Sequence, residues 1–279
     1  MAKFNMGKAD MNICFIGGGN MAAALIGGLL GKGYSAKQIS VVEINADNRA
    51  RLQRDFAVRA FESIADGIAG SQVIVFAVKP QQLREVAQQL APSLSGQLLI
   101  SIAAGILATD LARWSNSQAI VRAMPNTPAL IQSGMTGLYA LPAVTAAQRE
   151  QAQKILAAVG ETLWLQDEAM MDAVTAISGS GPAYVFYFIE ALQQAAQNLG
   201  FNAGDARRLS LATFLGASKL AASSDEDVSV LRARVTSKNG TTERALLSLS
   251  ANHVAEHIAL AAQAAAARSR EMGDELGKA

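Results

Sequence analysis

The sequence predicts a Rossmann-like α/β domain followed by an all-helical domain. Three observations predict it: short β-branched runs alternate with helical patterns from Met11 to about Gln166, a glycine-rich turn follows the first of those runs, and the strand signal stops after Gln166. Alternating strands and helices favour a parallel sheet with helices on both faces. We therefore expect a dinucleotide-binding domain over residues 11–166 and a helical domain over residues 167–279.

Hydrophobic patterning predicts the individual elements. Short apolar runs without clean alternation are typical of strands buried on both faces. The expected strands are 12–16, 39–44, 72–78, 98–102 and 119–122. The expected helices are 21–30, 47–56, 81–90 and 109–114 in the first half, then 184–199, 206–222 and the alanine-rich stretch 242–275. That last stretch carries few charges for its length, which predicts burial against a second chain.

Composition argues against several classes of partner. The chain has 279 residues and is 51% hydrophobic, with 24 Lys and Arg against 23 Asp and Glu. A net charge of +1 provides no broad positive field for nucleic acid or anionic lipid. No uncharged apolar run approaches the roughly 18 to 20 residues of a membrane span. We therefore expect binding to neither nucleic acid nor membranes.

The compartment and the first residues follow from equally simple signals. The single cysteine, Cys14, lies in an apolar run and is expected to be a buried small side chain. With no disulfide possible within the chain, the cytoplasm is the default compartment. Residues 1–10 lack the apolar segment of a signal peptide and are expected to be a disordered leader or a tag remnant.

The glycine-rich turn has the context of a dinucleotide cradle. After Ile16 it runs Gly17, Gly18, Gly19, Asn20, Met21 and opens the first helix as G-x-G-x-x-A. Small residues let the backbone approach a pyrophosphate closely, and the helix N-terminus presents free N–H groups to it. The alternative is a glycine turn that only packs the helix on the sheet.

An acidic residue at the end of the second expected strand strengthens the cradle. Glu43 lies 24 residues after Gly19, near the spacing of the ribose-binding carboxylate in such folds. That carboxylate would suit NAD but would repel the 2′-phosphate of NADP unless turned away. Asn45 and Arg49, just beyond it, could hold the phosphate, or all three could simply decorate a solvated loop.

Three later loops follow expected strands at the sheet edge where ligands bind. They are Ala77, Val78, Lys79 and Pro80; Ala103, Ala104 and Gly105; and Met124 to Pro128, which contains Asn126. We expect them around the nicotinamide half of the dinucleotide. The simpler interpretation is that the prolines merely break the strands.

Two loops of the helical half have the pattern of small-anion sites. One runs from Ser178 and Gly179 to Tyr184, and the other runs from Thr236 to Thr242 at the start of a helix. A hydroxyl-rich loop there can merely cap the helix, but the same free N–H groups can bind a carboxylate.

Together these motifs resemble pyrroline-5-carboxylate reductase from residue 11 onward: G-G-G-N-M-A-x-A, A-V-K-P-Q, M-P-N-T-P, S-G-S-G-P-A-Y and T-S-x-x-G-T-T occur in this order. The resemblance implies reduction of 1-pyrroline-5-carboxylate to L-proline in proline biosynthesis, with NADPH or NADH as hydride donor. It also implies a helical C-terminal dimerisation domain, with dimers that often assemble into rings. The substrate would be bound by Ser178, Gly179, Ser237, Gly240, Thr241 and Thr242, with Thr242 near the ring nitrogen.

One departure from the family pattern stands in the substrate loop. Members commonly have Ser-Pro-Gly-Gly where this chain has Ser237, Lys238, Asn239 and Gly240. Because Asn tolerates the left-handed conformation that glycine would supply, we expect the loop to keep its shape.

Two further patterns lead to other hypotheses. His253 and His257 fit H-x-x-E-H, but without other ligands we expect surface or interface histidines and no metal. The alternative function is a nucleotide-sensing Rossmann protein without turnover. A hydroxy-acid dehydrogenase would usually need a catalytic Lys or His, for which the helical half offers no obvious candidate.

Overall fold

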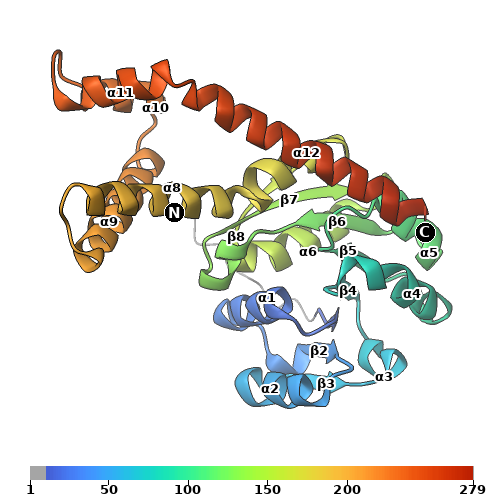
Figure 1. The fold of residues 1–279 in the computed structure, drawn as a ribbon. Helices are drawn as coiled ribbons and strands as arrows, with labels where there is room; N and C mark the ends of the chain where they lie inside the picture. The colour runs from blue at the N-terminus through green and yellow to red at the C-terminus, as the bar shows by residue number, and fades with distance from the viewer. Residues whose placement is uncertain (1–10, 279) are drawn as a thin grey trace. The chain divides into compact units, whose positions relative to one another are not determined.

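The computed structural model describes residues 11–278, and the leader expected over residues 1–10 lies outside the described residues. The chain forms two compact units (Figure 1). Of the described residues, the first contains 11–180 together with 265–278, and the second contains Gly181–Ala264. The first unit therefore ends 14 residues beyond the expected boundary at residue 166 and also includes the end of the chain.

One eight-stranded sheet forms the centre of the first unit, counting residues 11–278. Its strand order is β3-β2-β1-β4-β5-β6-β7-β8, with all pairs parallel except β6 and β7. The strands are β1 (Ile13–Ile16), β2 (Ile39–Val42), β3 (Arg59–Phe61), β4 (Val73–Phe76), β5 (Leu98–Ser101), β6 (Ile120–Met124), β7 (Gly134–Ala140) and β8 (Gly160–Trp164). The first six follow the doubly wound order, which reverses between β1 and β4.

Helices cover both faces of this sheet. Helices α1 and α2 contact each other, as do α4 and α5, and right-handed crossovers in opposite directions put the two pairs on opposite faces. The helices of this unit are α1 (Asn20–Gly31), α2 (Ala46–Phe56), α3 (Ile64–Ile68), α4 (Pro80–Leu90), α5 (Ala108–Ser115), α6 (Ala146–Leu156) and α7 (Met170–Val174). Shorter turns are η1 (Ala36–Gln38), η2 (Ala91–Ser93), η3 (Thr127–Ile131), η4 (Ala157–Val159) and the π-helix η5 (Thr175–Gly179).

The five expected strands are confirmed, and three strands were missed. β3 has three residues, which is too short for a pattern. β7 carries Gly134 and Gly137 in its sequence GMTGLYA, and β8 alternates half-buried with exposed positions rather than forming an apolar run. Glycine is required at Gly160, where φ is +151° and a Cβ would overlap the Gly134 backbone. Glycine-rich and edge strands do not give the buried-strand signal.

The hydrophobic core lies between the sheet and its helices. The fully buried side chains of this core include Phe15 and Phe76 of the strands, Leu25 and Leu29 of α1, and Leu83 of α4. Cys14 is a buried free thiol, as expected, and burial raises its pKa to about 12. Within residues 11–278 no helix is both long and apolar enough to cross a membrane.

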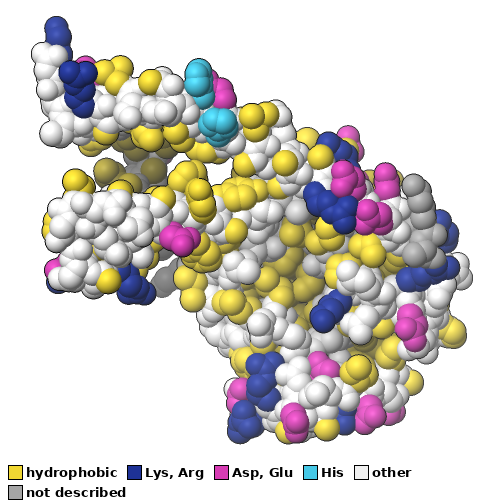
Figure 2. All heavy atoms as spheres, viewed as in Figure 1, with side chains coloured by type: hydrophobic (Ala, Val, Ile, Leu, Met, Phe, Trp, Pro, Cys, Tyr) yellow, Lys and Arg dark blue, Asp and Glu magenta, His cyan; other side chains and the backbone are white. Residues whose placement is uncertain are grey.

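The second unit is helical, as expected, but lacks a core of its own. It contains α8 (Gly181–Asn198), α9 (Ala203–Ala222), α10 (Val228–Arg234), α11 (Thr241–Ala251) and the first part of α12 (Val254–Lys278). Among its hydrophobic residues only Ala206 is buried. Large apolar side chains exposed on its helices include Val185, Phe186, Tyr187, Leu215, Leu220, Leu247, Leu249, Ile258 and Leu260, and Figure 2 shows such side chains on the surface of α8 and α11.

The alanine-rich stretch expected at 242–275 is divided into two helices. His253 has φ +53° and separates α11 from α12. The left-handed conformation is uncommon for a residue with a side chain. Because a histidine stands at this position and not glycine or proline, the sequence did not indicate the break.

Close helix packing at Gly28 yields a stability prediction. A Cβ there would lie 2.6 Å from the Ala158 carbonyl oxygen of η4, whereas a Cβ on Gly31 would approach nothing nearer than the Gln132 amide at 3.8 Å. Gly28→Ala should lower the free energy of unfolding by about 1–3 kcal/mol. Gly31→Ala, the matched control, should be neutral or slightly stabilising, since alanine favours helices by up to about 1 kcal/mol. Urea denaturation measures both, and equal effects would contradict the packing argument.

Candidate functional site

The glycine turn follows β1 and lies between the ends of its two neighbours, β2 and β4. The strand order reverses between β1 and β4, so the turn lies at that point. The Gly17 N–H donates to the Val42 carbonyl (2.8 Å), and the Ala77 N–H donates to the Ile16 carbonyl (2.8 Å). Gly17 has φ +98°, and a Cβ on it would lie 2.7 Å from the Ala77 carbonyl oxygen. The fold therefore requires glycine here and directs the turn to the edge where doubly wound sheets bind ligands.

Gly18 and Gly19 differ in what surrounds them. A Cβ on Gly18 would lie 2.5 Å from Leu52 of α2, whereas a Cβ on Gly19 would meet nothing within 4 Å. α1 begins directly after Gly19, with no side-chain cap and no acidic residue in its first turn. Its free N–H groups therefore face open space beside exposed Asn20, while Met21 packs against the core. This arrangement fits the pyrophosphate of a dinucleotide.

The Glu43 carboxylate supports the glycine turn. Oε2 accepts hydrogen bonds from the Gly18 N–H (3.0 Å) and the Asn48 amide (2.8 Å), and Oε1 accepts one from the Asn45 N–H (2.9 Å). Burial opposes its ionisation, but these hydrogen bonds outweigh burial and hold the pKa of Glu43 below its ordinary value. The carboxylate is thus charged near neutral pH and directed at the turn.

Asn45 and Arg49 are engaged by their own loop. The Asn45 side chain caps α2 by accepting from the Asn48 N–H (2.8 Å). Arg49 donates to the carbonyls of Glu43 (2.7 Å) and Ile44 (2.8 Å), and its Nη2 lies 2.9 Å from Glu62. These contacts order the loop after β2.

Two residues beside the cradle were missed in the sequence. Asn48 donates to the Gly18 carbonyl (3.0 Å), and Arg51 donates to the same carbonyl (3.2 Å) and to the Asn48 side chain (2.9 Å). They lie three residues apart on α2 and so share a face. The position of these two residues on the helix after Glu43 was the signal that could have identified them. It places the Arg51 guanidinium beside the glycine turn.

The loops after β4 and β5 begin the next two helices. Ala77 and Val78 are half-buried, exposed Lys79 precedes α4, and Pro80 is its first residue. After β5, the Ala103 N–H donates to the Ser101 hydroxyl (3.3 Å), and half-buried Ala104 leads to Gly105 with φ +79°. A Cβ on Gly105 would lie 3.3 Å from the Met272 Cβ. The left-handed backbone conformation and the packing of α12 both favour glycine here.

The loop after β6 meets the π-helix. The Asn126 amide donates to the Ser178 carbonyl (3.1 Å), and its oxygen accepts from the Met135 N–H (2.9 Å). A Cβ on Gly179 would lie 2.7 Å from the Met124 side chain. The Ser178 hydroxyl is buried and has no hydrogen-bond partner within residues 11–278. Single π-turns are frequent at functional sites, and two motifs distant in sequence come together at this one.

The remaining predicted residues form a turn in the second unit. The Gly240 N–H donates to the Ser237 carbonyl (3.0 Å), and the Asn239 N–H donates to Glu243 (2.7 Å). Asn239 has φ +60°, so the expectation that Asn supplies the left-handed conformation is confirmed. Gly240 precedes α11 without a side-chain cap. Among the described residues, the hydroxyls of Thr241 and Thr242 form no hydrogen bond.

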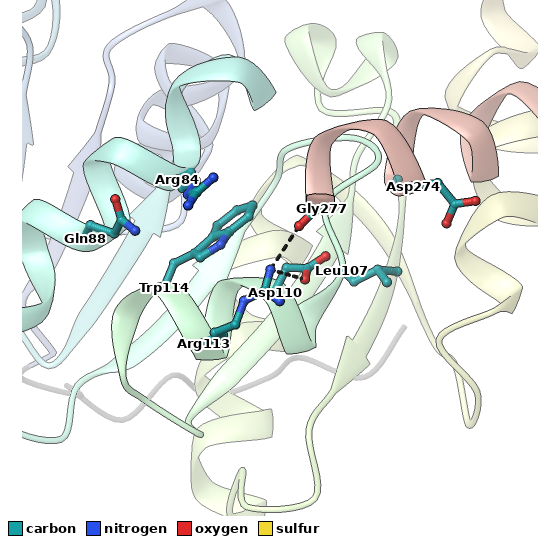
Figure 3. A pocket seen from close by; sticks show the side chains of 9 residues that line it. Arg84, Gln88, Leu107, Asp110, Arg113, Trp114, Asp274 and Gly277 are labelled. Atoms are coloured by element: carbon teal, nitrogen blue, oxygen red, sulfur yellow. Dashed lines mark hydrogen bonds and ion pairs between the residues drawn. The ribbon is translucent and has the colours of Figure 1, made fainter. Parts of the chain in front are cut away.

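A pocket of about 560 Å³ in the first unit contains none of the predicted site residues. Figure 3 shows it between α4, α5 and the end of α12. Arg113 donates to Asp110 (2.9 Å) and to the Gly277 carbonyl (3.0 Å) and so caps the end of α12. These contacts serve helix docking.

Comparison with known proteins assigns the class and then the family. Residues 12–105 match the family described as "NADP oxidoreductase coenzyme F420-dependent", and residues 168–272 match "Pyrroline-5-carboxylate reductase dimerisation". With the doubly wound sheet and its glycine cradle, the first match defines a dinucleotide-dependent oxidoreductase. A pyrroline-5-carboxylate reductase of Pseudomonas aeruginosa is 49% identical over 268 residues, covering 95% of this chain and 98% of its own. The chain belongs to the pyrroline-5-carboxylate reductase family.

Solved structures agree with this assignment. A pyrroline-5-carboxylate reductase from Coxiella burnetii has a TM-score of 0.91 at 38% identity, covering 95% of this chain and 99% of its own. A pyrroline carboxylate reductase from Plasmodium falciparum, solved with NADP bound, has a TM-score of 0.85 at 29% identity, covering 96% and 100%. The similarity extends through both units.

The lowered pKa of Glu43 predicts how stability responds to acid. Because its folded pKa lies below the ordinary 4.5, the charged carboxylate contributes stability fully above about pH 4.5 and loses it as the pH falls through the lowered value. Glu43→Gln should therefore be less stable than wild type at neutral pH, and the difference should shrink as the pH falls through the lowered pKa. Urea denaturation at several pH values measures it, and a difference independent of pH would contradict the role of the charge.

Proposed function

We propose that the protein reduces 1-pyrroline-5-carboxylate to L-proline by hydride transfer from NADPH, as the last step of proline biosynthesis. The observation that carries this proposal is family membership over nearly the whole chain, together with a cradle whose Gly19 faces open space. NADH is the second candidate donor. The alternative, nucleotide sensing without turnover, predicts cofactor binding but no reaction.

The cofactor is proposed to bind over the first unit. The pyrophosphate would lie at the uncapped start of α1, beside Gly17, Gly18 and Gly19. The Glu43 carboxylate is directed at the turn, where it accepts the Gly18 N–H. Its charge would therefore be turned away from a 2′-phosphate and would not oppose the binding of NADP. Arg51, beside Gly18, would add positive charge. When bound, the nicotinamide supplies the hydride, and the loops at 77–80, 103–105 and 124–128 would orient that end.

The substrate carries one carboxylate and a protonated imine, so it needs an anion site beside a hydroxyl rather than a strong base. The start of α11 offers free N–H groups, and the turn formed by Ser237 and Gly240 shapes the approach. We propose that Thr241 helps to bind the carboxylate and that the Thr242 hydroxyl orients the ring nitrogen or relays a proton to it. Ser178 and Gly179 would complete the substrate contacts, since the Ser178 hydroxyl is buried without a partner.

Self-association through the helical region follows from its missing core. A unit with one buried hydrophobic residue would leave an apolar surface of a size that soluble monomers rarely expose. We propose that residues 167–279 act as a dimerisation and substrate domain in a homodimer, which could assemble further into a ring. We also propose a cytoplasmic location, because the one cysteine is a buried free thiol.

A direct assay tests the function. The purified protein is mixed with NADPH and pyrroline-5-carboxylate, and loss of reduced nicotinamide absorbance is followed together with proline formation. Oxidation of NADPH that requires the substrate supports the proposal. NADPH binding without substrate-dependent oxidation would instead favour the nucleotide-sensing alternative. Repeating the assay with NADH determines the preferred donor.

Gly19→Val tests the cradle. The side chain would occupy the space where the pyrophosphate must approach the N–H groups of α1, and losing one charged hydrogen bond weakens binding by about 10- to 100-fold. Because a Cβ there meets no protein atom, the unfolding midpoint without cofactor should stay near wild type. Calorimetry measures the NADPH affinity, and unchanged affinity would remove Gly19 from the cofactor site.

Thr242→Ala tests the substrate loop. Loss of one hydrogen bond to a charged group should lower kcat/KM by about 10- to 100-fold while NADPH affinity is kept. Thr242→Ser retains a hydroxyl and should retain most activity. Full activity in Thr242→Ala would remove the residue from the mechanism.

The same two variants test whether each site draws on two protomers. If it does, refolding Gly19→Val and Thr242→Ala chains together in equal amounts should restore about a quarter of the sites, since half of the dimers are mixed and each mixed dimer has one intact site. Activity no greater than the mean of the two separate variants would contradict sharing.

A further inference from the structure

A buried ion pair lies in the first unit, outside every predicted site. Arg122 Nη1 is 3.0 Å from Glu168 Oε1, and the side chains are only 5% and 14% exposed. The same Glu168 oxygen accepts the Ala108 N–H at 2.7 Å. A buried charge is costly unless it is well paired, and such a pair is often no more stabilising than apolar residues of equal size. Its position therefore calls for an explanation other than stability.

The Glu168 oxygen joins three segments that carry proposed site residues. Arg122 lies in β6, opposite Ser101 of β5 and Tyr139 of β7, two residues before Met124 and the loop that follows it. Ala108 is the first residue of α5 and lies three residues beyond the loop that ends at Gly105. Glu168 itself precedes α7 and the π-helix of Ser178.

The arrangement is anchored at two points. Leu107, the N-cap residue of α5, provides no side-chain cap, so Glu168 caps the helix from 60 residues away. Ten residues beyond Glu168, the Ser178 carbonyl accepts from Asn126. The segment from Glu168 to Ser178 is thus held at one end through β6 and at the other through the loop that follows β6.

We infer that Glu168 is a positioning residue for hydride transfer. Through Arg122 and the Ala108 N–H, its carboxylate sets the relative positions of the 103–105 loop, the 124–128 loop and the Ser178 segment, around the nicotinamide end of the cofactor. The inference rests on the proposed function. Misplacing reacting groups by about 1 Å can cost about 100-fold in rate, so a residue that touches neither cofactor nor substrate can control the reaction.

The test separates positioning from stability. In the double variant Arg122→Met/Glu168→Met an apolar pair replaces the ion pair. Neither charge is left unpaired, so its unfolding midpoint should fall only by the effect of losing the hydrogen bond from the Ala108 N–H. Its kcat/KM should fall about 10- to 100-fold. A double variant with wild-type kcat/KM and NADPH affinity would overturn the inference, because the pair would then serve stability alone.

Two single variants provide a second test if the double variant folds poorly. Glu168→Gln retains an oxygen for the Ala108 N–H but removes the charge that pairs with Arg122, and Arg122→Lys retains a charge on a different head group. Both should lose kcat/KM, with Arg122→Lys losing less. Wild-type kinetics in Glu168→Gln would overturn the inference.

Leu90→Ala is the matched control for destabilisation. Leu90 is fully buried at the end of α4 remote from the loops that follow the strands, so its removal should lower the unfolding midpoint without changing kcat/KM. Equal loss of activity in Leu90→Ala would overturn the inference, since instability would then explain both.

NADPH affinity separates failure of this inference from failure of the proposed function. If wild type binds NADPH but does not reduce the substrate, the proposed function fails. The inference is then judged by NADPH affinity, which the double variant should weaken and Leu90→Ala should not. Equal affinity in all three proteins would overturn it.

Discussion

Strand β1 is hydrogen-bonded in parallel to β2 on one side and to β4 on the other, and the remainder of the first unit depends on this double pairing. Chain direction makes every strand of the parallel set end at the same edge. At that edge the chain leaving β1 must pass between two neighbouring strand ends, which leaves no room for a side chain at Gly17. The turn then opens α1 with its N–H groups toward the space beyond the sheet.

The second unit is organised by a different constraint. α8 and α9 contact each other, but Ala206 is the only hydrophobic residue of residues 181–264 that is fully buried, so the hydrophobic effect contributes far less here than in the first unit. Helices in proteins take most of their stability from such packing. Folding of this region and association of protomers are therefore expected to be coupled, with stability that depends on protein concentration.

The sequence predicted those parts of the fold whose signals are local. Glycines directly after an apolar run mark the cradle, and strands buried on both faces produce the runs that identify β1, β2, β4, β5 and β6. β7 and β8 were missed because glycines and exposed positions interrupt their patterns. The cap that Glu168 provides for α5 depends on proximity between residues 60 apart in sequence, and no local pattern encodes such a contact. For the same reason, the positions of Glu43, Asn45 and Arg49 after the second strand could be predicted, but their hydrogen-bond partners could not.

The burial of Cys14 has a practical consequence for work on this protein. Burial raises the pKa of its thiol to about 12, so the thiol is protonated at neutral pH, and the thiolate is the form that reacts with alkylating reagents. Since the chain has no other cysteine, it is already suited to site-specific labelling. A cysteine introduced at any exposed position would be the single reactive thiol, and a fluorophore attached there could follow the exchange of protomers between assemblies without altering the native residue.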